Sequence, residues 1–379
     1  MSRAASQPVT VMPDMGIVVL SLALILVGLI AISSASIEYA EINYNNNSFH
    51  TVRHLIYMAA AGIGAFVIYR VPLEFWEETG WVWLFLALGL LILVLIPGVG
   101  REVNGSQRWL PLGPFTLQPS EFAKLAMIVY LAGYMVRREH EVRHEWQGFL
   151  KPMAVLFAAT LLLMVEPDFG ATVIVAGSAF GMLFLAGVRL GHFLLILAGA
   201  LGALLVLVVS EPYRVKRLTA YTDPWADPYD TGFQLTQSLI AFGRGEWFGV
   251  GLGNSVQKLF YLPEAHTDFV FSIWAEETGF IGALAVILLY AALIGRVLWV
   301  GRAAQLAIYP FGAYLCYGIA LVFSGQAFVN MGVSSGLLPT KGLTLPFVSY
   351  GGTSLIVCCA MLALVLKVDS HVRSQGGRP

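Results

Sequence analysis

The sequence YLPEAHTDFVFSIWAEETGF, at residues 261–280, joins a polar loop to a long apolar run. It places Asp268 at the mouth of that run and Glu276 and Glu277 about two helical turns inside it. A carboxylate at membrane depth costs several kcal/mol, so it belongs in a polar cavity or at the interface. Asp268 is therefore either a functional carboxylate or, like Thr267, a cap for the helix that follows.

Apolar runs recur along all 379 residues, which are 58% hydrophobic and only 12% charged. A soluble domain has about twice that charged fraction, so the composition predicts a single polytopic membrane domain over residues 1–379. We expect an all-α fold. The net charge of −1 gives no indication of a nucleic-acid partner. The three cysteines all lie in apolar runs, where we interpret them as packing residues.

About ten stretches are long enough to cross a bilayer as helices. Their predicted starts lie near Gly16, Val52, Gly80, Pro119, Pro152, Gly170, Gly191, Thr267, Tyr309 and Pro346. The first stretch is longer than the apolar core of a signal peptide, so we expect it to remain as an uncleaved span.

Basic residues in short loops predict the orientation. Arg137, Arg138, Arg143 and Lys151 mark one loop as cytoplasmic, and the tails at 1–15 and 371–379 fall on the same side. The stretch 211–266 then forms a large extracytoplasmic loop. It contains five cations that indicate an anionic ligand on the outer face: Arg214, Lys216, Arg217, Arg244 and Lys258.

Further cations are predicted at the outer face. Arg101 and Arg108 lie in the loop 98–118, whose glycines and prolines exclude a regular helix. Lys124 follows near the start of the next span, where it either pairs with Glu121 or faces a cavity and meets a phosphate. Lys341 is a lone cation in a short outer loop, which favours contact with a ligand.

The motif Glu166-Pro167-Asp168 ends one span and opens the next. Asp168 is a candidate helix cap. It is also a candidate cavity carboxylate, and pairing with Lys124 would lower the cost of burying both charges.

Within the large loop, Leu235, Leu239 and Phe242 predict an amphipathic helix over 232–242 that lies on the membrane. Gln234, on another face of this helix, is a candidate ligand for sugar hydroxyls. The glycine-rich stretch 249–254 lets backbone N–H groups approach an anion, although it lacks a nucleotide-binding fingerprint.

The last span contains small and polar residues at 349–354, which indicate either close helix packing or a cavity wall. His140 to His144 matches a zinc-protease pattern, but it lies in a charged loop with no third ligand, so we predict no metal site.

Many cations around one accessible carboxylate suit glycosyl transfer from a lipid-linked pyrophosphate sugar. A pyrophosphate neutralised by cations leaves readily, so one carboxylate acting as base is sufficient, whereas glycosidases need two. Transport of the lipid is the competing class, and a structural scaffold is a third. The position of Asp268 at the outer end of its helix favours chemistry on substrate already outside.

Several motifs, in order, resemble the signature of the SEDS family, the FtsW/RodA proteins. They are Leu262-Pro263-Glu264-Ala265-His266-Thr267-Asp268-Phe269, Ala275-Glu276-Glu277, Asn104-Gly105-Ser106-x-Arg108-Trp109, Gln118-Pro119-Ser120-Glu121-x-x-Lys124, Glu166-Pro167-Asp168-Phe169-Gly170 and Pro346-Phe347-Val348-Ser349-Tyr350-Gly351-Gly352. The resemblance extends from the first span to the last.

The resemblance implies a ten-span peptidoglycan glycosyltransferase that polymerises lipid II. It carries the catalytic aspartate onto Asp268, as general base on the acceptor hydroxyl with inversion at the donor carbon. The candidate lipid II-binding residues are Arg101, Arg108, Lys124, Asp168, Arg217, Gln234, Lys258, His266, Lys341 and Ser349.

Residues 339–346 are more similar to the FtsW division branch than to the RodA elongation branch, which stays an alternative, as does a lipid II flippase. The implied partners are a class B penicillin-binding protein as division transpeptidase, the FtsQ–FtsL–FtsB complex and FtsN. The implied location is the bacterial inner membrane at the division septum. We expect no cofactor, with a divalent cation as the alternative.

Overall fold

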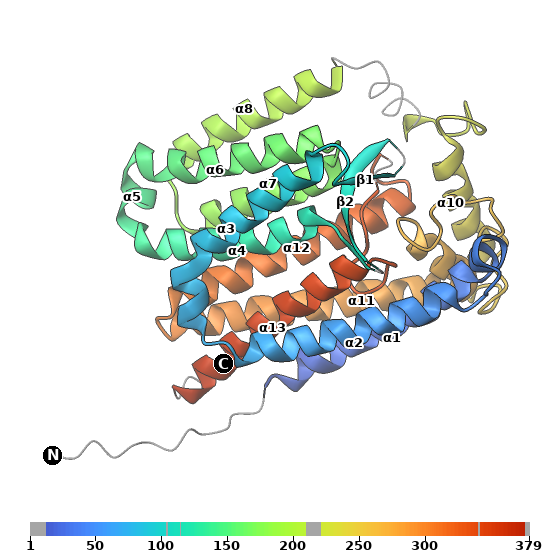
Figure 1. Ribbon diagram of the computed structural model, residues 1–379, viewed down its shortest axis with the longest axis horizontal. Coiled ribbons are helices and arrows are strands. Elements are labelled where there is room, and N and C mark those ends of the chain that lie inside the picture. The colour runs from blue at the N-terminus through green and yellow to red at the C-terminus, as the bar shows by residue number, and fades with distance from the viewer. Residues whose placement is uncertain (1–12, 104, 114, 210–220, 340–341, 376–379) are drawn as a thin grey trace.

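The computed structural model describes residues 13–375 except 104, 114, 210–220 and 340–341. Within these residues the chain is a bundle of long helices with one small sheet at one end (Figure 1). The long helices are α1 (Met15–Tyr44), α2 (Phe49–Arg70), α3 (Leu73–Leu95), α4 (Pro119–Arg137), α6 (Trp146–Val165), α7 (Phe169–Leu185), α8 (Leu190–Val209), α11 (Val270–Leu306), α12 (Pro310–Ser334) and α13 (Gly352–Ser374). The predicted all-α, polytopic fold class is confirmed.

These helices follow the order of the predicted spans, with shifted starts. The third begins at Leu73 instead of Gly80, and the last begins at Gly352 instead of Pro346. The last shift arises because Ser349 accepts a hydrogen bond from the Leu345 backbone N–H (2.8 Å), which closes a turn before α13. Among the described helices, seven are long and apolar enough to cross a membrane, so the count of ten stays a prediction.

The bundle has two distinct ends (Figure 1). One end, which we call the loop end, carries the sheet, α10 (Phe233–Gly245) and the segment 246–268. The other carries α5 (Glu139–His144) and the end of α13. The predicted outer loops 98–118 and 211–266 therefore meet at one end, as far as the structure describes them.

The sheet at the loop end has three antiparallel strands in the order β1-β2-β3. β1 (Arg101–Val103) pairs with β2 (Ser106–Leu112), and β2 pairs with β3 (Phe115–Leu117). The absence of helix here was predicted, whereas the strands were not. The two antiparallel strand pairings give the backbone N–H and C=O groups of this loop hydrogen-bond partners at the end of the bundle.

Small residues bring helix backbones close together in the centre of the bundle. An added Cβ on Gly28 of α1 would lie 2.8 Å from Val348 Cα, and one on Gly80 of α3 would lie 3.3 Å from Tyr130 Cα of α4. Close approach at small residues is how helices gain packing energy in lipid. For Gly352, the added atom would overlap the Tyr57 ring, so the small residues that begin α13 serve packing.

Helix α11 is broken inside its length. Its 37 residues would extend about 55 Å if continuous, well beyond the roughly 30 Å hydrocarbon core of a bilayer. Gly279 interrupts it with φ 69° and ψ −168°. The segment after α10 fills the break, because the carbonyls of Glu246 and Trp247 accept from the amides of residues 280 and 281 at 2.8 and 3.3 Å.

Candidate active site

Asp268 lies just before α11, at the loop end of the bundle. The N-cap of α11 is Phe269, and no side chain caps this helix. The interpretation of Asp268 as a simple cap is therefore wrong. Its backbone N–H donates to the Glu264 carbonyl (3.1 Å) one turn earlier, and its side chain is half-buried.

A buried asparagine joins Asp268 to the loop before α13. Asn330 of α12 donates from Nδ2 to the carbonyl of Asp268 (2.8 Å) and to that of Leu343 (2.5 Å). Gly342 lies directly against the Asp268 carboxylate, and a methyl group there would overlap it. Asn330 thus ties the Asp268 backbone to the 342–345 loop, and Gly342 leaves room for the carboxylate beside that loop; the sequence patterns did not single out either residue.

The surroundings of Asp268 favour its protonated form. Burial, together with the charges of Glu264 and Asp168, raises the pKa of Asp268 from its ordinary value of 3.8 to about 7, against the opposing effect of Arg108. A carboxylate with a pKa near the working pH is suited to proton transfer, because both protonation states are accessible.

Arg108 and Asp168 form a second charged pair at the same end. The Arg108 guanidinium on β2 lies 3.9 Å from Asp168 and donates to the carbonyls of Glu166 (3.2 Å) and Pro167. Asp168 caps α7, as predicted, by accepting from the Ala171 amide (3.1 Å). Ser120 of α4 donates to its other oxygen at 2.9 Å. The Arg108 side chain stays 26% exposed, so it can still reach a ligand.

Glu166 is a buried acid that the sequence motif contained but did not mark as a site residue. Both of its carboxylate oxygens lack a hydrogen-bond partner among the described residues. Burial and the charge of Asp168 raise the pKa of Glu166 to about 8, against the opposing effect of Arg108. At neutral pH Glu166 therefore carries a proton for much of the time, next to a permanently charged guanidinium.

Lys124 is buried in the bundle instead of facing an open cavity. Its ammonium lies 2.7 Å from Glu121, one helical turn earlier, and its side chain is 1% exposed. The predicted pair between Lys124 and Asp168 is wrong, because Asp168 is held by Arg108 and Ser120. The alternative prediction, an i, i+3 pair with Glu121, matches the structure.

The remaining described candidates have different surroundings. His266 packs in an aromatic cluster with Tyr39 and His50, each 5.1 Å away between ring centroids, and burial lowers its pKa to about 4. It is therefore neutral at pH 7. Gln234 is half-buried on α10, and Arg101 is exposed on β1. The Ser349 hydroxyl is used in the turn before α13.

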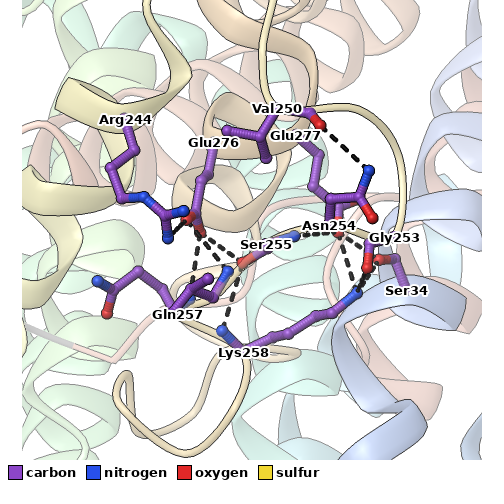
Figure 2. A network of polar contacts seen from close by, with 11 residues as sticks. Ser34, Arg244, Val250, Gly253, Asn254, Ser255, Gln257, Lys258, Glu276 and Glu277 are labelled. Carbon is purple, nitrogen blue, oxygen red and sulfur yellow. Dashed lines mark hydrogen bonds and ion pairs between the residues drawn. The ribbon is translucent and has the colours of Figure 1, made fainter.

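Two predicted outer cations are paired with buried acids of α11 (Figure 2). Lys258 lies 3.2 Å from Glu277, and Arg244 lies 2.8 Å from Glu276. The amides of the glycine-rich stretch are occupied too, since those of Val250 and Gly251 donate to the carbonyls of residues 276 and 277 at 3.0 Å each. These two amides of the stretch therefore bind the backbone of α11 and do not face an anion.

Arg217 and Lys341 lie outside the described residues, as do Arg214 and Lys216. The three cysteines are free: Cys316 and Cys358 are buried and Cys359 is half-buried, in keeping with a packing role. Within the described ranges, no group of three or more His, Cys, Asp or Glu side chains is arranged to hold a metal ion.

The fold and the site define a multi-pass membrane protein that holds a titratable carboxylate and an accessible guanidinium at the loop end of its helices. The chain belongs to the FtsW, RodA and SpoVE family of cell cycle proteins, whose family model matches residues 15–374.

Its relatives indicate the branch within the family. It is 52% identical to the probable peptidoglycan glycosyltransferase FtsW of Hahella chejuensis over 98% of this chain and 94% of the relative. It is also 52% identical to the probable peptidoglycan glycosyltransferase FtsW of Pseudomonas fluorescens, over 94% and 88% of the two chains.

Solved structures share the fold along nearly the whole chain. One comes from work on structural coordination of polymerization and crosslinking by a peptidoglycan synthase complex, with a TM-score of 0.78 and 31% identity over 96% of this chain and 99% of that one. Another is the rod shape determining protein RodA of Thermus thermophilus, with a TM-score of 0.71 and 29% identity over 95% and 97%.

Proposed function

We propose that this chain is a peptidoglycan glycosyltransferase of the FtsW type, which polymerises lipid II with Asp268 as its general base. The observation that carries the assignment of Asp268 is its environment: a half-buried carboxylate with a pKa of about 7, held from its backbone at the loop end. The family membership and the FtsW relatives support the reaction.

In the proposed reaction, Asp268 accepts the proton of the acceptor sugar hydroxyl. The hydroxyl oxygen attacks the donor carbon, the bond from that carbon to the lipid pyrophosphate breaks, and the configuration at the carbon inverts. The pyrophosphate leaves with the electron pair, and Asp268 later releases its proton to water. The pyrophosphate is a good leaving group once cations neutralise it, so a single carboxylate is sufficient.

Arg108 is the described cation that best fits the leaving group. It is close enough to Asp268 to influence its pKa, and its side chain is partly exposed. Lys124 and Lys258 are buried and neutralised by Glu121 and Glu277, so either would need to leave its partner to bind phosphate. We assign Arg101, Asp168, Arg217, Gln234, His266, Lys341 and Ser349 to the surroundings of the lipid II headgroup.

We further propose a class B penicillin-binding protein as partner, with the FtsQ–FtsL–FtsB complex and FtsN nearby at the septum of the inner membrane. The similarity to a chain from a peptidoglycan synthase complex supports a partner of this kind. We include no cofactor. Addition of EDTA to the reaction tests this, since an unchanged rate is expected and a rate restored by a divalent cation would contradict it.

The direct test compares the wild type with Asp268→Asn, each purified with the transpeptidase and supplied with labelled lipid II in detergent. Polymer from the wild type and a loss of at least about 100-fold in the variant are expected, because a positioned base contributes that much. Equal polymer from both proteins would refute Asp268 as the base. No polymer from either, with lipid II crossing vesicle membranes, would favour a flippase.

A further inference from the structure

Two buried acids of α11 hold the segment that leads to Asp268 (Figure 2). Glu276 has no exposed surface, and its carboxylate accepts from the Val256 and Gln257 amides at 3.2 and 3.3 Å. It also accepts from the Ser255 hydroxyl and from the Arg244 guanidinium. Four donors on one carboxylate compensate for much of the cost of burying its charge.

Glu277 ties the same segment to α1. Its carboxylate accepts from the Ser34 hydroxyl (2.5 Å) and pairs with Lys258 (3.2 Å). The Lys258 ammonium donates to Ser34 (3.0 Å) and to the Gly253 carbonyl (2.7 Å) as well. Ser34, Lys258 and Glu277 therefore form a closed triangle that joins α1, α11 and the segment between α10 and α11.

The break in α11 keeps this segment in place. Gly249 has φ 80°, and an added Cβ on Gly279 would lie 2.6 Å from the Phe248 amide nitrogen. The two backbones are thus in direct contact, and only glycine fits at both positions. Contacts on both sides of the break set the depth of residues 246–251 along α11.

Asp268 lies at the far end of a short length of chain that is fixed to α11 twice. Residues 255–258 are held by Glu276 and Glu277, and residue 268 is joined to the start of α11 by the chain itself. Between them, Leu262, Ala265 and Phe269 pack in a small apolar cluster with Ala35, Ile273 and Val333. At most thirteen residues of chain therefore separate the part held by Glu276 and Glu277 from Asp268.

We propose that Glu276 and Glu277, with Lys258 and Ser34, are positioning residues for Asp268: they hold the 255–268 segment so that its carboxylate meets the acceptor hydroxyl. This inference rests on the proposed function. These residues do not touch the reacting atoms, and they act through the length of chain that they fix. Displacement of a catalytic group by about 1 Å can cost about 100-fold in rate, so such a clamp has a measurable effect.

The test uses Glu277→Gln, Lys258→Met and the double variant in the full chain with its transpeptidase, assayed for lipid II polymerisation. We expect kcat to fall about 10- to 100-fold with KM changed less than about 3-fold, because binding groups are left in place. The double variant should be no worse than the poorer single one, since both break one interaction. Lys258→Arg should restore most of the rate.

A second readout separates positioning from loss of structure. A moved Asp268 has different charges around it, so the pH midpoint of kcat should shift in Glu277→Gln. The rate is divided by the folded fraction measured at each pH, because a loss of folded protein alone then leaves the midpoint unchanged. If the charge variants do not fold, Ser34→Ala replaces them, because it removes only one hydrogen bond from each of Glu277 and Lys258. We expect Ser34→Ala to lower kcat about 2- to 5-fold. Glu139→Gln, which breaks an exposed pair with Arg143, is the control and should leave kcat unchanged.

The clamp is refuted if folded Glu277→Gln and Lys258→Met keep the wild-type kcat and pH midpoint, or if only KM changes. Asp268→Asn is measured in parallel to separate this inference from the proposed function. An inactive Asp268 variant beside fully active clamp variants overturns the inference alone. An active Asp268 variant overturns the proposed function, whatever the clamp variants do.

Discussion

At the scale of single residues, the environment of Asp268 makes it a base that is easily tuned. Burial and the neighbouring acids raise its pKa to about 7, while Arg108 opposes them. Glu166 is protonated for much of the time at neutral pH, so it adds little negative charge beside Asp168 and Arg108. The site therefore holds the carboxylate that we propose as the proton acceptor near the midpoint of its titration.

The polymerisation rate should consequently increase with pH through about 7. Below that pH Asp268 is protonated and cannot accept the hydroxyl proton, so kcat should fall about tenfold for each pH unit. Initial rates between pH 5 and pH 9, in buffers of constant ionic strength, provide the measurement. A rate that is flat from pH 5 to pH 7 would contradict a base with this pKa.

The same shift predicts that Asp268 costs stability. Its pKa is higher in the folded state than in the unfolded chain, so the folded state binds more protons between about pH 4 and pH 7, and stability falls as pH rises through that window. Asp268→Asn should therefore raise the free energy of unfolding at pH 8 by an amount on the order of 1 kcal/mol, which a higher thermal midpoint reports. The gain should vanish near pH 4. An equal gain at both pH values would have another cause.

Arg108 offers a test of the leaving-group contact. Arg108→Ala removes the guanidinium from both the 166–168 turn and the neighbourhood of Asp268. We expect kcat to fall about 10- to 100-fold, as for loss of one group that stabilises developing charge. Arg108→Lys, which keeps the charge but loses the fork of donors, should recover only part of the rate. Full activity of Arg108→Ala would remove Arg108 from the mechanism.

At the scale of elements, the break in α11 determines where the loop end is anchored. Gly279 has a positive φ, and its neighbours across the break are backbone atoms of residues 247–249. A side chain at this position meets both strain and overlap. The two halves of α11 and residues 246–251 thus pack together around the break at Gly279, and we call this arrangement the joint.

Gly279→Ala should lower stability by about 1 to 3 kcal/mol. Gly295→Ala is the matched control, because it lies on the same helix with open space around the added methyl group. We expect this control to leave the thermal midpoint unchanged or slightly raised. Thermal unfolding in detergent measures both variants, and equal midpoints would show that the joint tolerates a side chain.

Much of the arrangement of elements was predictable, because long apolar runs report helices directly. The joint was not, since Gly279 sits inside an apolar run that looks continuous. The partners of Glu276 and Glu277 come from residues 244–258 and from Ser34, and no local pattern links such distant positions. For the same reason the sequence indicated Asp268 but not Asn330 and Gly342, which hold and face it.

At the scale of the whole molecule, the joint places part of a predicted outer loop inside the bundle's length. Gly279 is nine residues from the start of α11, or about 14 Å along the axis, which is close to half the thickness of a bilayer core. Three large apolar side chains of the inserted segment are exposed, namely Trp247, Phe248 and Leu252, whereas Glu246 and Asn254 are its exposed polar residues. The depth and the exposed aromatic pair suit contact of residues 247 and 248 with hydrocarbon.

Cysteine labelling tests this depth. In a chain with its native cysteines replaced, Phe248→Cys should resist a water-soluble maleimide in membranes, whereas Tyr229→Cys should react readily. Both positions are highly exposed in the bundle itself, at 81% and 90%, so only the membrane distinguishes them. Equal labelling would place residue 248 in water and contradict its contact with the hydrocarbon of the membrane.

The joint in α11 also determines the order in which the protein can be built. A ribosome delivers α1 first, then residues 246–258, and the second half of α11 only after them, because synthesis proceeds from the N-terminus. Ser34 therefore has no Glu277 carboxylate to bind until 243 further residues have been made. Before residues 276–281 are made, the Val250 and Gly251 amides lack the α11 carbonyls that they bind in the folded protein. The part of the molecule that holds the proposed catalytic aspartate is thus completed only after the second half of α11 has been made, and a chain stalled within α11 would lack the contacts that hold this part.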